Sequence, residues 1–232
     1  MLTTLGEGGI NMKLKKSEKL SLIIIAVVIS VSILVLLNRG DLENIDSSSN
    51  GHIVAKVNGE IINLDELNIR YNLFRNSMNK IQFLNDVVIP NKLLLQEAKK
   101  KGITISSVEI EIAFNKLLQE KKISKEEFMD VIKEQEISKK ETDQLIGEQV
   151  IIAKLVKQIV PELTISSKES NNFYQKNLDA FTNNKGVMQF EEVNGKIKKM
   201  LLKIKRETKV REYVIDLAEK GNVVMYDLLF LK

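Results

Sequence analysis

The sequence contains no cysteine and no tryptophan, and it has one histidine and two prolines among 232 residues. The lack of cysteine excludes disulfides, thiolate catalysis, cysteine-ligated metals and a lipid-modified cysteine after an apolar segment. The histidine, His52, follows Gly51 in a polar segment, so we expect it to be exposed and inert. The chain has no P-loop, dinucleotide-binding, hydrolase or zinc-protease motif. We therefore predict no catalytic residue, no cofactor and no metal site.

Aromatic residues are few, at 5%, whereas hydrophobic residues as a whole make up 44% of the chain. We expect a core built mainly from leucine, isoleucine and valine. The scarcity of proline and the many Lys, Glu, Leu and Ile residues predict a mainly α fold. Residues 1–40 hold five of the 35 basic and two of the 31 acidic residues, which leaves 30 and 29 for residues 41–232. This nearly neutral remainder argues against a nucleic-acid partner.

Residues 20–37, LSLIIIAVVISVSILVLL, carry no charge. A helix of this length spans about 27 Å, which is just enough for a bilayer core. Four lysines lie between residues 13 and 19, so the positive-inside rule places residues 1–19 in the cytoplasm and the C-terminus outside. We predict an uncleaved, single-pass transmembrane helix in the cell membrane, and a cleaved signal peptide is the alternative. Residues 1–11 look unlike the rest, which favours Met12 as the natural start.

The polar residues 38–52 predict a flexible tether, followed by one extracytoplasmic domain over residues 53–232. A β-hairpin is expected over 53–62, because Asn58-Gly59 suits a type I′ turn. Residues 222–226 are rich in β-branched side chains and predict a strand. We expect this strand to pair with the hairpin and so to join the two ends of the domain.

Helix starts are marked four times by the pattern Ser-x-x-Glu, in which the serine caps an amide and the glutamate reaches back to the cap. These capping boxes begin at Ser106, Ser124, Ser138 and Ser166. The helices that they predict cover residues 107–121, 125–135, 139–160 and 167–180. Four such boxes, each followed by an amphipathic stretch, indicate a helical array with short loops.

Three further helices follow from the spacing of apolar residues. The first is capped by Asn63 and has one apolar face, made of Leu64, Leu67, Tyr71, Phe74 and Met78. The second covers 82–101, is kinked or restarted at Pro90, and buries Leu93, Leu94, Leu95 and Ala98. The third covers 190–220 and has two apolar stripes: Val193, Ile197, Leu201 and Ile204, then Val210, Val214 and Leu217. Its basic segment, 196–206, is expected to be a solvated face, with a membrane surface or nucleic acid as alternative contacts.

Two blocks of this sequence are similar to a known family. The first block, residues 54–62, reads VAKVNGEII, and the second, residues 91–106, reads NKLLLQEAKKKGITIS. They resemble the N-terminal chaperone module of the extracytoplasmic parvulin-type foldases, the SurA and PrsA kind. Residues 167–181 and 190–226 resemble the segments that lead into and follow the isomerase domain of that family.

The chain departs from this family between Phe181 and Phe190, where only eight residues, TNNKGVMQ, are present. An isomerase domain needs far more residues, and its two active-site histidines cannot be present in a chain with His52 alone. The resemblance therefore implies the SurA-like chaperone domain without the parvulin isomerase, and we predict that the protein is not an enzyme.

The resemblance implies a membrane-anchored holdase that binds unfolded or newly exported polypeptides. The alternative is a membrane-anchored adaptor or structural subunit that binds one folded partner. A holdase leaves apolar side chains exposed, and aromatic and methionine side chains suit varied partners. The residues that we predict to contact clients are Phe114, Phe128, Met129, Phe173 and Tyr174. For each of them, an ordinary place in the core is the alternative.

Overall fold

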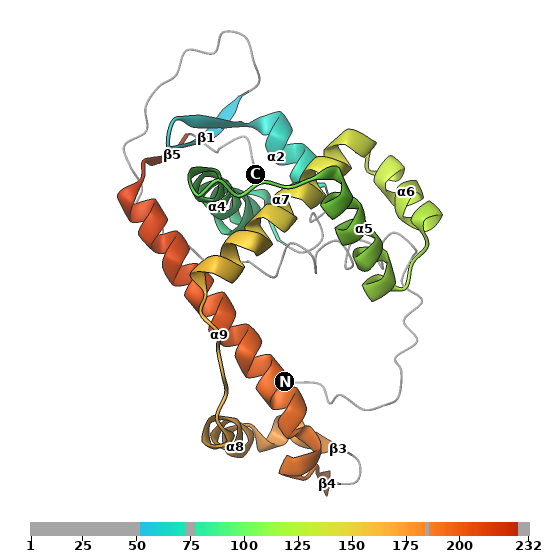
Figure 1. Ribbon diagram of the computed structural model, residues 1–232, viewed down its shortest axis with the longest axis vertical. Coiled ribbons are helices and arrows are strands. Elements are labelled where there is room, and N and C mark those ends of the chain that lie inside the picture. Colours follow the sequence, from blue (N-terminus) through green and yellow to red (C-terminus); the bar gives the residue numbers. More distant parts are fainter. Residues whose placement is uncertain (1–51, 73–77, 184–185, 227–232) are drawn as a thin grey trace. The chain divides into compact units, whose positions relative to one another are not determined.

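The computed structural model describes residues 52–72, 78–183 and 186–226, which fold mainly into helices with a small antiparallel sheet (Figure 1). The predicted anchor over 20–37, the start at Met12 and Phe74 lie outside the described residues. Among the helices of the described residues, none combines the length and the apolar character that crossing a bilayer requires. The described residues form two compact units. We call residues 52–159 with 210–226 the large unit, and residues 160–209 the small unit.

The sheet of the large unit has three antiparallel strands in the order β2-β1-β5. β1 (Ile53–Val57) and β2 (Glu60–Asn63) form the predicted hairpin. Its turn has positive φ at both Asn58 and Gly59, as a type I′ turn requires. β5 (Val223–Met225) pairs with β1, so that Ala55 lies opposite Met225. The predicted pairing of the hairpin with a C-terminal strand is confirmed.

Asn58 fastens this turn to the end of the chain. Its backbone N–H donates to the Asn222 carbonyl at 2.7 Å, and its Oδ1 accepts from the Asn222 N–H at 2.8 Å. Its Nδ2 donates to Gln96 Oε1, also at 2.8 Å, so the turn is tied to a helix as well. Gly221 lies so close that a Cβ on it would be 2.6 Å from Asn58 Oδ1. The turn chemistry and the strand pairing therefore depend on each other.

The first helix, α2 (Leu64–Tyr71), is capped by Asn63, whose side chain accepts from the Glu66 N–H. It ends at Tyr71, so the prediction that it reaches Met78 is wrong. The chain resumes with α3 (Lys80–Phe83), a π-helical turn η2 (Leu84–Val88) and α4 (Ile89–Lys100). Pro90 has no N–H and would clash with a carbonyl one turn earlier, so the wider π turn just before it relieves this crowding. The predicted restart at Pro90 is confirmed.

The four capping boxes are present, each with the serine accepting the N3 amide and the glutamate accepting the serine amide. They open α5 (Ser107–Lys121), α6 (Lys125–Glu134), α7 (Lys139–Ile159) and α8 (Ser167–Lys176). These bounds match the predicted helices to within one residue, except that α8 ends early and is followed by a 3-10 turn, η3 (Leu178–Phe181). In the large unit, α4 packs against β1 and α7, and α5 packs against α7.

A largely buried ion pair joins α2 to α7 inside the large unit. Arg70 donates two hydrogen bonds to the Glu148 carboxylate, at 2.6 and 3.0 Å. The two side chains are only 15% and 13% exposed. Burial alone would lower the pKa of Arg70, but the bonds with Glu148 and the nearby Glu66 raise it. Arg70 therefore stays charged, and Glu148 is the main group that compensates this charge.

The small unit is built from α8, η3, two short strands and the first part of α9 (Phe190–Lys220). Its core contains Tyr174, Val193 and Ile197, with partly buried apolar residues packed around them. The strands β3 (Thr182–Asn183) and β4 (Gly186–Val187) pair with each other. Both strands lie between Phe181 and Phe190. This is the stretch where the parvulin-type foldases, which the sequence resembles, would carry their isomerase domain.

α9 contributes to both units and buries a different face in each. Val193 and Ile197 are buried in the small unit, and Val210 and Val214 are buried in the large unit. Ile204, which the sequence predicts on the first apolar stripe, is 47% exposed. That part of the prediction is wrong, because the core of the small unit takes in Val193, Ile197 and Leu201 of α9 but not Ile204.

Candidate functional site

The five residues that we predict to contact clients fall into two groups. Phe114 of α5 and Phe128 of α6 lie in the large unit, with ring centroids 5.1 Å apart in an edge-to-face arrangement. Met129 follows Phe128 and is half-buried. Phe173 and Tyr174 lie in the small unit, where both rings lie near Phe181. The structure thus places the five residues in two separate aromatic groups, one in each unit.

Burial differs within these groups. Phe128 and Tyr174 are buried, and the Tyr174 hydroxyl donates to the Met188 carbonyl at 2.6 Å. Phe114, Met129 and Phe173 are half-buried. Substitution of Phe128 or Tyr174 would therefore disturb the fold as well, and the three half-buried side chains are better places to test for client contact. The client-binding role of all five stays a prediction.

The most exposed large apolar side chains of the described residues include a pair that the sequence analysis does not single out. Val108 and Ile112, on α5, are 62% and 61% exposed. They lie four residues apart, so they share one side of the helix. The same helix buries Leu117 and Leu118 on its other side. α5 therefore has a second, solvent-facing apolar strip of the kind that binding surfaces use.

A signal for this strip is present in the sequence. The buried side of α5 follows from Ile110, Phe114 and Leu117, whose spacings of four and three are those of one helix face. Val108 and Ile112 repeat the same spacing of four but start two positions earlier. Two residues correspond to about 200° around a helix, so such a second series has to lie on the opposite side.

Polar interactions hold α5 in place. Ser106 and Glu109 form its capping box, and Lys154 of α7 reaches Glu109 at 2.5 Å and donates to the Thr104 carbonyl at 2.8 Å. The bond from Lys154, together with those from Ser106, lowers the pKa of Glu109 to about 2. The exposed strip thus stands on a helix whose first turn is tied to α7.

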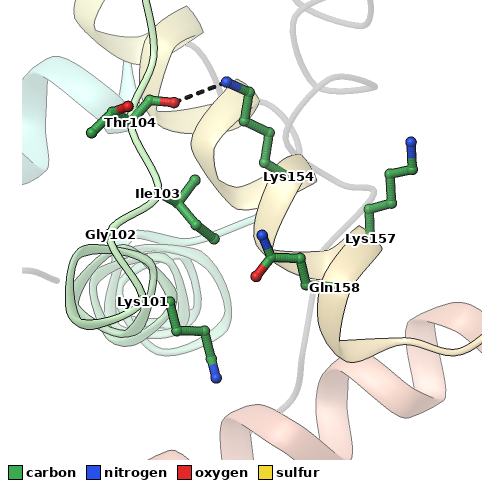
Figure 2. Close-up of a pocket in the computed structure, with 7 residues that line it drawn as sticks. All are labelled: Lys101, Gly102, Ile103, Thr104, Lys154, Lys157 and Gln158. Atoms are coloured by element: carbon green, nitrogen blue, oxygen red, sulfur yellow. Dashed lines mark hydrogen bonds between the residues drawn. The ribbon is translucent and has the colours of Figure 1, made fainter.

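Next to this attachment lies a shallow pocket of about 350 Å³ (Figure 2). It is formed by the end of α4 with the segment after it and by the last turns of α7, and its lining residues are Lys101, Gly102, Ile103, Thr104, Lys154, Lys157 and Gln158. Lys154 is engaged by Glu109, and Lys101 lies 3.4 Å from Glu97. Figure 2 shows Lys101 and Lys157 extending in different directions rather than converging on one point. The pocket thus offers little focused charge to a ligand.

Polar groups elsewhere in the described residues make structural contacts. His52 is exposed, and its carbonyl accepts the Leu64 N–H. Across residues 52–72, 78–183 and 186–226, no group of three acidic or histidine side chains could hold a metal ion. Partial burial and the hydrogen bond to Glu97 raise the pKa of Tyr213 to about 12. That bond joins α9 to α4 and has a structural role.

The sequence profile of the SurA-like N-terminal domain family matches residues 11–156. Because the match covers more than half of the chain, the chain belongs to the SurA-like N-terminal domain family. The resemblance described from the sequence is confirmed, and family membership supports a chaperone-type function.

Among solved structures, the chain is similar to a protein structure from the human pathogen Campylobacter jejuni. The work that reported this structure describes the virulence factor PEB4 and the periplasmic protein Cj1289 as two structurally related SurA-like chaperones. The TM-score is 0.53 at 15% identity, and the similarity covers 76% of this chain and 99% of that chain. At this identity, the likeness concerns the fold. A comparison with curated proteins found no match.

Proposed function

We propose that this protein is a membrane-anchored, extracytoplasmic holdase that binds unfolded or newly exported polypeptides. Its membership of the SurA-like N-terminal domain family is the observation that carries this proposal. The exposed pair Val108 and Ile112 supplies an apolar surface for binding, since segments of an unfolded chain are rich in apolar side chains that need to be covered.

The holdase role can be tested by the suppression of aggregation of several unrelated unfolded proteins. We expect the protein to suppress aggregation of all of them at near-stoichiometric ratios without nucleotide. The variant Val108→Gln/Ile112→Gln removes the exposed strip and should weaken suppression several-fold while the melting temperature stays unchanged. Glu111→Gln/Asn115→Gln, on the same exposed side of α5, is the matched control and should behave like the wild type. Protection of one protein alone would favour the adaptor alternative.

The proposal includes the absence of prolyl isomerase activity. The stretch between Phe181 and Phe190 holds the short strands β3 and β4, and the chain has one histidine. Uncatalysed prolyl isomerisation takes tens to hundreds of seconds, so a proline-limited refolding reaction shows catalysis readily. We expect no acceleration when the protein is added in catalytic amounts. An acceleration that a point substitution abolishes would refute this part.

The membrane anchor is proposed from the apolar run at 20–37 and the lysines before it. Alkaline carbonate should leave the chain in the membrane fraction. Protease added to spheroplasts should digest the residues beyond about residue 40, because the proposal places them outside the cytoplasm. Complete protection of these residues in intact spheroplasts, with digestion after lysis, would reverse the orientation.

A further inference from the structure

The part of α9 that belongs to the small unit carries an exposed surface. This surface is distinct from the α5 strip that we propose binds clients. Met200 and Ile204 are 38% and 47% exposed and lie four residues apart. Lys196, Lys199 and Lys203 are exposed as well, and each lies three or four residues from Met200 or from another of these lysines. Residues at such spacings are neighbours on a helix surface. We call these five residues the basic–apolar face.

Positive charge is concentrated here although the domain as a whole is nearly neutral. Residues 160–209 hold ten basic and six acidic residues, a net charge of +4. Residues 41–232 have a net charge of 30 minus 29, or +1, so the rest of that region has a net charge of −3. Within 196–209, seven residues are basic and one is acidic. The asymmetry therefore arises mainly from α9.

The lysines of this face are available to a partner. Lys196 and Lys199 have no ion-pair or hydrogen-bond partner in the part of the chain that the structure describes. Lys203 lies 3.8 Å from Glu207, on the same helix, and its side chain is 67% exposed. By contrast, Lys205, on another side of the helix, is held by Glu169 at 2.6 Å and by the Thr164 carbonyl. Packing thus uses Lys205 and leaves the basic–apolar face open.

We propose that the basic–apolar face binds the surface of a bilayer that contains anionic phospholipid. A helix that lies in a membrane interface combines aliphatic side chains that enter the acyl boundary with lysines that contact anionic headgroups, and this face combines both. Single-stranded nucleic acid would require stacking on aromatic rings, and residues 191–212 contain none. Unrelated unfolded clients share no single sign of charge, so the lysines of this face favour anionic headgroups over such clients.

The inference rests on the proposed membrane anchor. An anchored chain meets the bilayer as an intramolecular partner, so a weak surface affinity suffices to hold the small unit on the membrane. The expected consequence is that the position of the small unit depends on the lipid composition.

The absence of cysteine allows a direct test with the full chain reconstituted into vesicles. Met200→Cys, labelled with an environment-sensitive fluorophore, should shift to the blue in vesicles of phosphatidylcholine with phosphatidylglycerol and stay unshifted in phosphatidylcholine alone. About 1 M salt reduces the screening length to about 3 Å, so the shift should largely disappear there. A label at Glu120→Cys, in the large unit, is the positional control and should not respond.

Charge variants separate surface binding from a change of fold. In the chain labelled at Met200, Lys196→Gln/Lys199→Gln/Lys203→Gln should lower the equilibrium constant for binding of this face to the anionic vesicle surface, read from the blue shift, roughly tenfold or more. Lys116→Gln/Lys125→Gln/Lys133→Gln removes the same charge from exposed positions of the large unit and should have little effect. Circular dichroism should show unchanged helicity for both variants, and both should still suppress client aggregation.

The outcomes are distinct. A Met200 label that gives the same signal in anionic and neutral vesicles refutes the inference and leaves the holdase proposal intact if aggregation suppression persists. A label that responds to an unfolded acidic client but not to vesicles assigns the face to peptides and also refutes it. Release of the chain by alkaline carbonate contradicts the proposed anchor. In that case anionic vesicles are added to the free chain, and a blue shift of the Met200 label supports membrane binding by the basic–apolar face, whereas an unchanged label refutes it.

Discussion

Removal of Glu148 should destabilise the large unit strongly, because it leaves the Arg70 charge largely buried. Breaking a fully buried ion pair from one side costs about 3–5 kcal/mol. Here both side chains keep a small exposed fraction, and Arg70 retains Glu66 at 3.3 Å. We therefore expect Glu148→Leu to lower the free energy of unfolding by about 2–3 kcal/mol. Deprotonation cannot relieve the charge, because an arginine guanidinium stays protonated in proteins.

Urea unfolding of the fragment 41–232, followed by circular dichroism, measures this effect. A loss of about 2 kcal/mol corresponds to a midpoint shift of about 1 M for an m-value of about 2 kcal/mol/M. Arg70→Met/Glu148→Leu removes both charges and should recover most of the stability. Asp143→Ala breaks the exposed pair with Lys139 and should cost less than about 0.5 kcal/mol. Two results would contradict this account of the ion pair. One is that Glu148→Leu lowers the free energy of unfolding by no more than Asp143→Ala does. The other is that Arg70→Met/Glu148→Leu loses as much stability as Arg70→Met and Glu148→Leu lose together.

Three further changes test other parts of the fold. Gly221→Ala should destabilise the large unit by about 1–3 kcal/mol in urea unfolding, because the new Cβ would overlap Asn58 Oδ1 and separate the turn from β5; an unchanged midpoint would contradict this. The folded-state pKa values of Glu109 and Glu169 are lowered to about 2 from 4.5, so the stability that they contribute is complete above pH 4.5 and should fall as the pH drops from 4.5 towards 2. In Glu109→Gln/Glu169→Gln the acid dependence of the melting temperature should be smaller, and an identical dependence would refute this. Deletion of 190–232 removes β5 and the two valines that α9 buries in the large unit, so the remaining fragment should lose its cooperative transition; a fragment 41–185 that melts like the 41–232 fragment would disprove the coupling.

Local signals made most of the fold predictable. The serine and glutamate of each capping box, the Asn58-Gly59 turn and Gly221 act over a few residues, so the sequence marks the corresponding element ends directly. The pairing of β1 with β5 was predictable as well, but the burial of individual helix residues by distant partners was not. α2 ends at Tyr71 although its apolar spacing continues, and Ile204 is exposed although it continues a stripe. At Ile204 the spacing is suited to burial, but a packing partner is needed to realise it.

The candidate site shows the same limit. Aromatic and methionine side chains were predicted as client contacts from their chemistry, yet Phe128 and Tyr174 are buried, and they pack against rings of neighbouring elements. The aliphatic pair Val108 and Ile112 is exposed because α7 packs on the other side of α5. Which apolar side chains remain exposed is a property of the assembled helices, so composition alone does not show it.

The pairing of β1 with β5 has a consequence for the order in which the chain becomes complete. Ribosomal synthesis proceeds from the N-terminus, so Ala55 is made long before Met225, its partner across the sheet. The small unit is a continuous segment, 160–209, and all its contacts are available before residue 210 is added. Until β5 arrives, β1 presents an unpaired edge of the kind that invites other strands. During its own synthesis, the large unit is thus an unfinished polypeptide of the kind that we propose the mature protein binds.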